Sequence, residues 1–187
     1  MRTSDPNAFR SAEAGSAVDW LGAHGRSGDE VGVIVFSDEI RALDPVPVRG
    51  NEGRVKSALA DRSNLGGGTP LGPAFDRAAS MLGRRAAATP VVVLISDGVP
   101  NATFVSQRTA IEEAVRALPS GTRLHLIAMN GQRVFEPVRS HWESAGLAGI
   151  HLVDHLQAGA ISSAMAAILS AETGQAVAVG AIPAGTP

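Results

Sequence analysis

An uninterrupted apolar run from Val91 to Ile95 is followed directly by Ser96, Asp97 and Gly98. β-Branched and leucyl residues without polar alternation are typical of a strand that is buried on both faces, and such strands belong to α/β sheets. Ligands of α/β sheets bind at the carboxyl ends of the strands. The run therefore predicts a buried strand, and it makes Asp97 the first candidate for a site residue.

Helical and strand patterns alternate along the rest of the chain. We expect helices at 7–24, 52–60, 71–85, 106–118, 137–145 and 158–170, and strands at 31–36, 40–43, 91–95, 124–129 and 150–153. The N-cap of the fourth helix is expected to be Ser106 or Thr109. Pro45 and Pro47 place the second strand at an edge of the sheet. The sequence thus predicts an α/β fold, with a Rossmann-like, mostly parallel sheet, one antiparallel edge strand and helices on both faces. Residues 1–172 are expected to form one domain and residues 173–187 a flexible C-terminal tail.

Composition excludes several classes of function. The 187 residues suffice for one domain with a sizeable core, and the net charge of -2 without basic blocks gives no electrostatic basis for binding nucleic acid or an anionic membrane. The absence of Cys excludes disulfides and thiolate chemistry. No segment reaches transmembrane length. If Met1 is the true start, the chain lacks a signal peptide and is expected in the cytoplasm, whereas a lost N-terminus that carried a signal peptide or an anchor would place it elsewhere. Abundant Ala, Gly and Arg beside a single Lys suggests a bacterium with a GC-rich genome.

A second loop supplies another candidate ligand. Three glycines and Thr69 precede the helix expected at 71–85. Thr69 offers a hydroxyl and Asp97 a carboxylate, and both are oxygen ligands that suit a hard divalent cation such as Mg²⁺. Gly67, Gly68 and Gly98 have no Cβ, so the backbone there can approach an incoming partner closely.

The two loops resemble motifs of one known family. The segment from Gly67 to Leu71 and the segment from Leu94 to Asn101 look like the second and third motifs of a von Willebrand factor type A domain, and the strand pair within 31–43 fits the same family. The resemblance implies a protein-binding module that is not an enzyme. It implies a metal-ion-dependent adhesion site for Mg²⁺ or Mn²⁺, in which Thr69 and Asp97 are ligands and an acidic side chain of the partner protein completes the coordination. Gly67, Gly68 and Gly98 would then line the partner-facing loop.

One part of the family pattern is missing. The first motif, Asp-x-Ser-x-Ser after a buried central strand, does not occur in the chain, which begins at Met1 and runs directly into its first expected helix. The resemblance therefore predicts that this strand and motif have been lost, and a start codon assigned too late, a natural truncation and a deliberate shortening all account for such a beginning. Because three of the five protein ligands are absent, we expect weak or no metal binding by this chain.

Simpler interpretations compete with the cation site. Asp97 is also suited to capping the turn that follows it. Thr69 is suited to capping the helix before Pro70, a role that is compatible with metal binding. The glycines do not end in the Gly-Lys-Ser/Thr of a phosphate-binding loop. The histidines, among them His125 and His151 in expected strands, are interpreted as structural.

Two alternative functions stay open. The first is a metal-dependent hydrolase or phosphohydrolase that uses Asp97, which would need a second carboxylate on an adjacent strand end. The sequence shows none there, because Asp38 belongs to an expected hairpin turn. The second is an accessory von Willebrand-type partner of an AAA+ ATPase.

Overall fold

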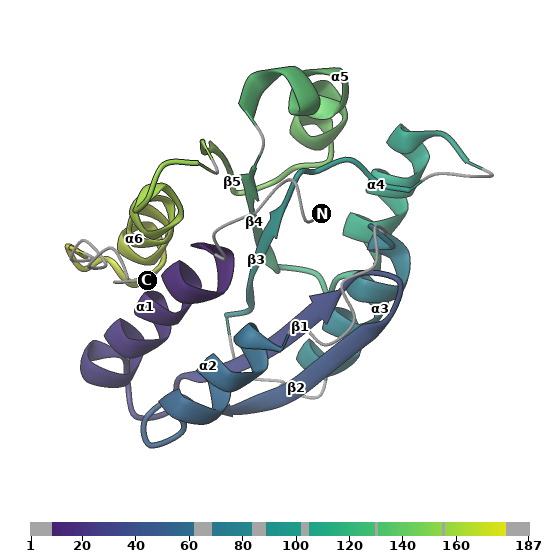
Figure 1. Ribbon diagram of the computed structural model, residues 1–187. Coiled ribbons are helices and arrows are strands. Elements are labelled where there is room, and N and C mark those ends of the chain that lie inside the picture. Colours follow the sequence, from purple (N-terminus) through teal and green to yellow (C-terminus); the bar gives the residue numbers. More distant parts are fainter. Residues whose placement is uncertain are drawn as a thin grey trace.

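The computed structural model describes residues 9–61, 69–83, 89–101, 105–129, 131–154 and 156–178 (Figure 1). Helices and strands alternate as expected. The helices are α1 (Phe9–His24), α2 (Glu52–Ala60), α3 (Leu71–Leu82), α4 (Gln107–Ala117), α5 (Gly131–Ser144) and α6 (Ala160–Thr173). The strands are β1 (Glu30–Phe36), β2 (Ile40–Pro47), β3 (Val91–Ser96), β4 (Arg123–Ala128) and β5 (Gly149–Leu152). The predicted α/β class is confirmed.

The described strands form two sheets. Strands β3, β4 and β5 pair in parallel in that order, while β1 and β2 form an antiparallel pair. Within these sheets β1 and β3 each have a neighbour on one side only. The predicted parallel strands and the antiparallel edge strand are therefore present, but the described residues do not join them into one continuous sheet.

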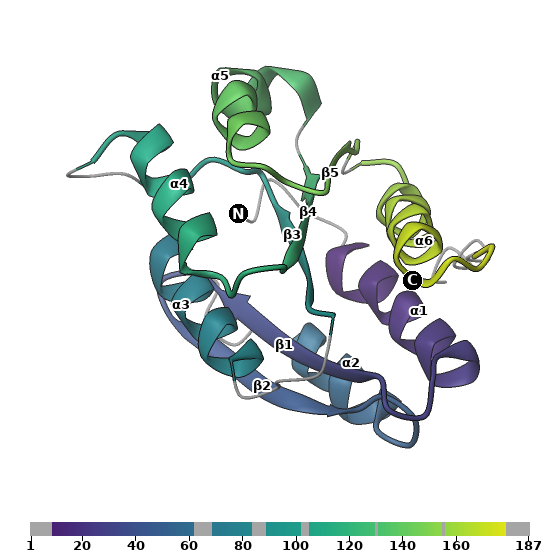
Figure 2. The same ribbon diagram turned by 180° about the vertical axis from the view of Figure 1, so that it is seen from behind.

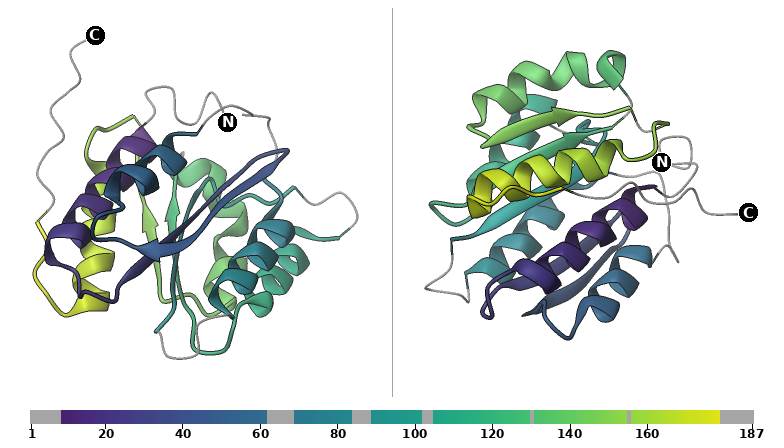
Figure 3. Two further views of the ribbon diagram at one scale, coloured as in Figure 1. Left: turned by 90° about the horizontal axis from the view of Figure 1, so that it is seen from below. Right: turned by 90° about the vertical axis from the view of Figure 1, so that its left-hand side faces the viewer.

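Helices cover both faces of the strands. Seen from below, α1, α2 and α6 lie on one side and α3, α4 and α5 on the other (Figure 3). Helix α1 contacts both α2 and α6, and α3 contacts both the β1–β2 pair and α4. Helices α1 and α3 thus connect the two sheets on opposite faces, as the view from behind also shows (Figure 2).

Each helical layer encloses apolar side chains. The largest cluster lies between β3, β4 and the helices α3, α4 and α5, and its fully buried members include Ile111, Leu126, Phe135 and Trp142. A second cluster joins β4 to α6 through Ile127, Ile161 and Ile168. A third joins β1 to α1 and α2 through Val18, Val33 and Val55. Among the described helices, none is both long and apolar enough to cross a membrane.

Strand β3 is less buried than its sequence predicts. Its side chains vary in burial, and Val91 is 37% exposed whereas Leu94 and Ser96 are buried. The strand that is buried along nearly its whole length is β4, from Leu124 to Ala128. The reason is the pairing: β4 lies between two strands, whereas β3 has only one described neighbour.

Several boundaries also differ from the prediction. Helix α5 begins at Gly131, six residues before the expected start, and therefore contains Pro137. Proline removes one helical hydrogen bond. Pro137 itself is exposed, but the helix that contains it buries Val138 and Trp142 in the core. The packing of these side chains outweighs the lost hydrogen bond. Strand β2 continues to Pro47, and both prolines lie on a strand with one described neighbour, which agrees with the expected edge position. Helix α6 extends to Thr173, and the domain boundary at 172 stays a prediction.

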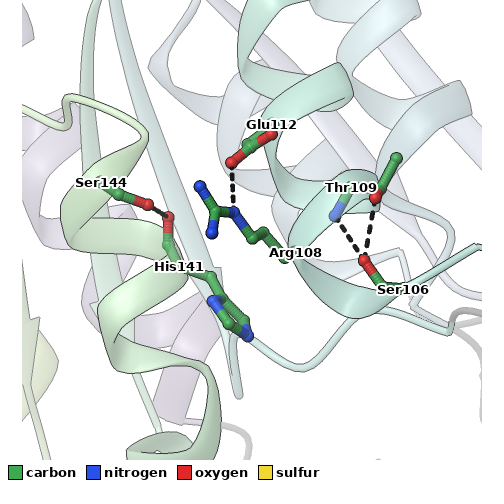
Figure 4. A network of polar contacts seen from close by, with 6 residues as sticks. All are labelled: Ser106, Arg108, Thr109, Glu112, His141 and Ser144. Atoms are coloured by element: carbon green, nitrogen blue, oxygen red, sulfur yellow. Dashed lines mark hydrogen bonds and ion pairs between the residues drawn. The ribbon is translucent and has the colours of Figure 1, made fainter.

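The start of α4 follows the capping prediction. Ser106 is the N-cap, and its Oγ accepts a hydrogen bond of 3.1 Å from the Thr109 backbone N–H (Figure 4). One turn further on, the Arg108 guanidinium donates to the Glu112 carboxylate at 2.7 Å and holds the pKa of that carboxyl below its usual range. The alternative cap, Thr109, lies inside the helix.

A buried carboxylate joins the first described helix to the last. Glu13 of α1 is 2% exposed, and its two oxygens accept hydrogen bonds of 2.8 Å from the backbone N–H groups of Gly159 and Ser162. These donors lie at the N-terminus of α6, where the helix dipole favours a negative charge. Glu13 therefore caps α6 from a different helix.

Candidate functional site

Asp97 lies directly after β3 and organises a tight turn. Its Oδ1 accepts hydrogen bonds from the Val99 backbone N–H at 3.1 Å and from the Ser96 hydroxyl at 3.3 Å. The Ser96 Oγ, which is fully buried, accepts in turn from the Gly98 N–H at 3.2 Å. The simple prediction that Asp97 caps its own turn is thus confirmed.

Helix α5 holds this turn in place through Trp142. The Trp142 Nε1–H donates to the Gly98 carbonyl at 2.8 Å, and Trp142 is fully buried. Gly98 has a φ of 74°, a left-handed conformation that costs an L-residue energy. A Cβ added at Gly98 would lie 2.9 Å from two ring carbons of Phe135. Only glycine fits between the turn and the ring without displacement of one of them.

The structure brings the Thr69 segment to this turn. The backbone N–H of Asn101 donates to the Thr69 carbonyl at 3.2 Å, which ties the loop after β3 to the start of α3. Thr69 is 3% exposed. It does not cap the helix, because the N-cap position belongs to Pro70 and carries no side-chain cap bond. Gly67 and Gly68 lie outside the described residues, so Gly98 is the described member of the predicted partner-facing loop.

The donor set falls short of a complete cation site. Mg²⁺ prefers near-octahedral coordination by oxygen, and the two candidate ligands on the described loops are the Thr69 hydroxyl and the Asp97 carboxylate. Among the residues that the structure describes, no group of three or more His, Asp or Glu side chains is arranged to hold a metal ion. These residues alone do not fit a divalent cation.

A second polar cluster lies on the face of the sheet that α6 covers. The His125 Nε2 and the Glu172 carboxylate are 2.7 Å apart, and the Arg123 Nε donates to the same carboxylate. Burial alone would raise the pKa of Glu172, but the hydrogen bonds from Arg123 and His125 outweigh it and hold that pKa below its usual range. His151 of β5 lies beside His125, with ring centroids 5.9 Å apart.

The sequence indicates this cluster only weakly. His125 and His151 are expected strand residues, but Glu172 is 47 positions away from His125 and lies beyond the expected end of the last helix. Arg123 and His125 are two residues apart on one strand and therefore share a face. That spacing is the signal from which a common partner for both side chains could have been inferred.

Comparison with known proteins identifies a domain family. The family model described as von Willebrand factor type A domain matches residues 1–100. No curated protein matches the chain by sequence.

Three solved structures show the same fold at low identity. An aerotolerance-related membrane protein from Bacteroides fragilis NCTC 9343, carrying multiple mutations to serine, is 18% identical with a TM-score of 0.60 over 89% of both chains. The pilus adhesin SpaC from Lactobacillus rhamnosus GG is 14% identical with a TM-score of 0.66, over 83% of this chain and 27% of the adhesin. A von Willebrand factor type A protein from Catenulispora acidiphila is 16% identical with a TM-score of 0.58, over 86% of this chain and 37% of that one.

Proposed function

This chain belongs to the von Willebrand factor type A domain family, and from that premise we propose that it is a protein-binding module without catalytic activity of its own. Domains of this family typically act by binding other proteins. One structural neighbour is a pilus adhesin, which agrees with such a role without identifying a partner for this chain.

The binding edge of the module lies where β3 ends. The observation that carries the proposal is the hydrogen bond from the Asn101 N–H to the Thr69 carbonyl, which holds the two family-like loops against each other. Gly98 lies in the same loop as Asp97 and is held by α5, so a partner would meet a turn whose shape is set before binding. Gly67 and Gly68, which lie outside the described residues, stay predicted members of the partner-facing loop.

A hydrolase on the same sheet is the weaker interpretation. Such an enzyme needs a second carboxylate close to Asp97. The neighbouring strand β4 ends at Ala128 and is followed by Met129, so it supplies no carboxylate beside Asp97. We therefore assign Asp97 to turn formation and partner contact.

The cation chemistry of this chain is expected to be weak. With Thr69 and Asp97 as its only family-like ligands, residues 1–187 should bind Mg²⁺ or Mn²⁺ with a Kd of about 1 mM or weaker. Isothermal titration calorimetry at low ionic strength measures this directly, and Asp97→Asn serves as the comparison. Micromolar affinity in the unaltered chain would contradict the proposed incomplete site.

Partner binding should depend on Asp97 and not on carboxylates elsewhere. We expect quantitative crosslinking to recover a defined set of proteins with the unaltered chain and to lose that set with Asp97→Asn. Glu113→Gln makes the same chemical change at an exposed position of α4 and should keep the set. If Asp97→Asn captures the same proteins as the unaltered chain, the binding edge lies elsewhere.

A further inference from the structure

Two histidines from neighbouring strands face one glycine. In the parallel register of β4 and β5, His125 lies opposite Gly149 and Ile127 lies opposite His151. Side chains two positions apart on a strand point to the same face, so His125, Gly149 and His151 share one face of the sheet. The two imidazole rings are 5.9 Å apart at their centroids.

Each ring has an unpartnered nitrogen close to Gly149. Within the described part of the chain, the buried His125 Nδ1 and His151 Nε2 have no hydrogen-bond partner, although buried polar atoms nearly always have one. A Cβ built on Gly149 would lie 3.0 Å from His125 Nδ1 and 3.1 Å from His151 Nε2. The two nitrogens therefore converge on a space that exists because residue 149 has no side chain.

The surroundings orient His125 as a metal ligand. Its Nε2 lies 2.7 Å from the Glu172 carboxylate, whose pKa the hydrogen bonds from Arg123 and His125 hold below its usual range, so an Nε2–H donates to that carboxylate. In the neutral ring the lone pair then lies on Nδ1, which is 3.0 Å from the Cβ position of Gly149. A carboxylate that fixes the tautomer of a histidine in this way is the usual companion of a metal-bound imidazole.

We propose that His125 Nδ1 and His151 Nε2 form a binding site for a transition-metal ion such as Zn²⁺, Ni²⁺ or Cu²⁺, with water completing the coordination. Imidazole nitrogen selects these ions over Mg²⁺ and Ca²⁺, which prefer oxygen. His125 is 3% exposed, whereas His151 is only half-buried. An ion would therefore enter the site past His151. Burial and the nearby His125 ring lower the pKa of His151, and a lower pKa favours the neutral form of the ring.

This site is independent of the binding edge at Asp97. It uses imidazole nitrogens on the face covered by α6, whereas the binding edge uses oxygen atoms after β3. The histidine site could therefore fail its test while the proposed binding edge holds, and the reverse is also true. Zn²⁺ tests the histidine site, whereas Mg²⁺ and Mn²⁺ test the oxygen ligands after β3.

The experiment titrates the full chain with Zn²⁺ in competition with a chromophoric chelator, and repeats the titration with Mg²⁺. We expect Zn²⁺ to bind at about one ion per chain and Mg²⁺ not to compete with it. His151→Asn should abolish this binding. Glu172→Gln, which removes the orienting carboxylate, should weaken it by about 10- to 100-fold. Asp97→Asn should leave it unchanged.

Two further variants test whether Zn²⁺ binds between these two histidines. His141→Asn removes a histidine of α5 outside the cluster, and Zn²⁺ binding should persist. Gly149→Ala should prevent binding, because its Cβ would occupy the space between the two nitrogens. Circular dichroism confirms that each variant is folded. Zn²⁺ binding that survives His151→Asn, or is lost with His141→Asn, would overturn the proposal, as would the absence of Zn²⁺ binding by the unaltered chain.

Discussion

Extending the chain at its N-terminus with a six-residue apolar strand followed by Asp-x-Ser-Gly-Ser is expected to raise the melting temperature by about 10 °C or more. The reason lies in the pairing of the strands. β1 and β3 each lack a described neighbour on one side, while α1 and α3 connect the two sheets on opposite faces (Figures 1 and 3). A strand added between β1 and β3 would pair with both and be covered on both faces.

The size of the effect follows from what the added strand gains and loses. About four buried side chains at ~2 kcal/mol each and about eight ladder hydrogen bonds at ~1 kcal/mol each favour insertion. Ordering about six residues costs ~1.5 kcal/mol for each of them. The net gain is about 7 kcal/mol, and for a chain of this length each 1 kcal/mol raises the melting temperature by about 2–4 °C.

A matched control separates the strand from the metal ligands. An extension with the same apolar strand but Asn-x-Ala-Gly-Ala in place of the motif should give most of the stabilisation without Mg²⁺ binding. The extension with Asp-x-Ser-Gly-Ser should in addition bind Mg²⁺, because it adds a carboxylate and two hydroxyls to Thr69 and Asp97. Differential scanning calorimetry with and without Mg²⁺ measures both effects. An unchanged melting temperature for both extensions would show that no strand fits between β1 and β3.

The alternation of patterns along the chain was sufficient to predict the fold class. Local signals placed α2 at its observed bounds, and Ser106 marked the start of α4. Helix capping and hydrophobic periodicity depend on residues that are close to one another in the sequence, so both can be recognised from the sequence alone. The burial of β3 was not predictable in the same way, because it depends on whether another strand lies beside it.

The site was predictable only in part, for a related reason. Asp97 was identified because it follows an apolar run, and its role in the turn depends on residues that are close in sequence. The support of that turn by Trp142 involves residues 44 positions apart. The meeting of His125 with Glu172 spans 47 positions. Contacts of this kind arise from the tertiary fold, and no periodicity in the sequence encodes them.

Gly98→Ala should destabilise the protein by about 2–5 kcal/mol and lower the melting temperature by about 5–20 °C. Two costs combine at this position. The left-handed backbone with a φ of 74° disfavours alanine by about 1–2 kcal/mol. The added methyl group also meets the Phe135 ring at 2.9 Å, and overpacking in a core costs about 1–3 kcal/mol.

Gly146→Ala provides the matched control for the first cost. Gly146 has a φ of 80°, yet a Cβ there meets none of the described residues within 4 Å, so this variant measures the backbone strain alone. The difference between the two variants in urea-induced unfolding therefore reports the contact with Phe135. Equal losses of stability would mean that the Phe135 ring moves aside freely. A larger loss at Gly98 would show that α5 fixes the turn that carries Asp97, which links the stability of the core to the shape of the proposed binding edge.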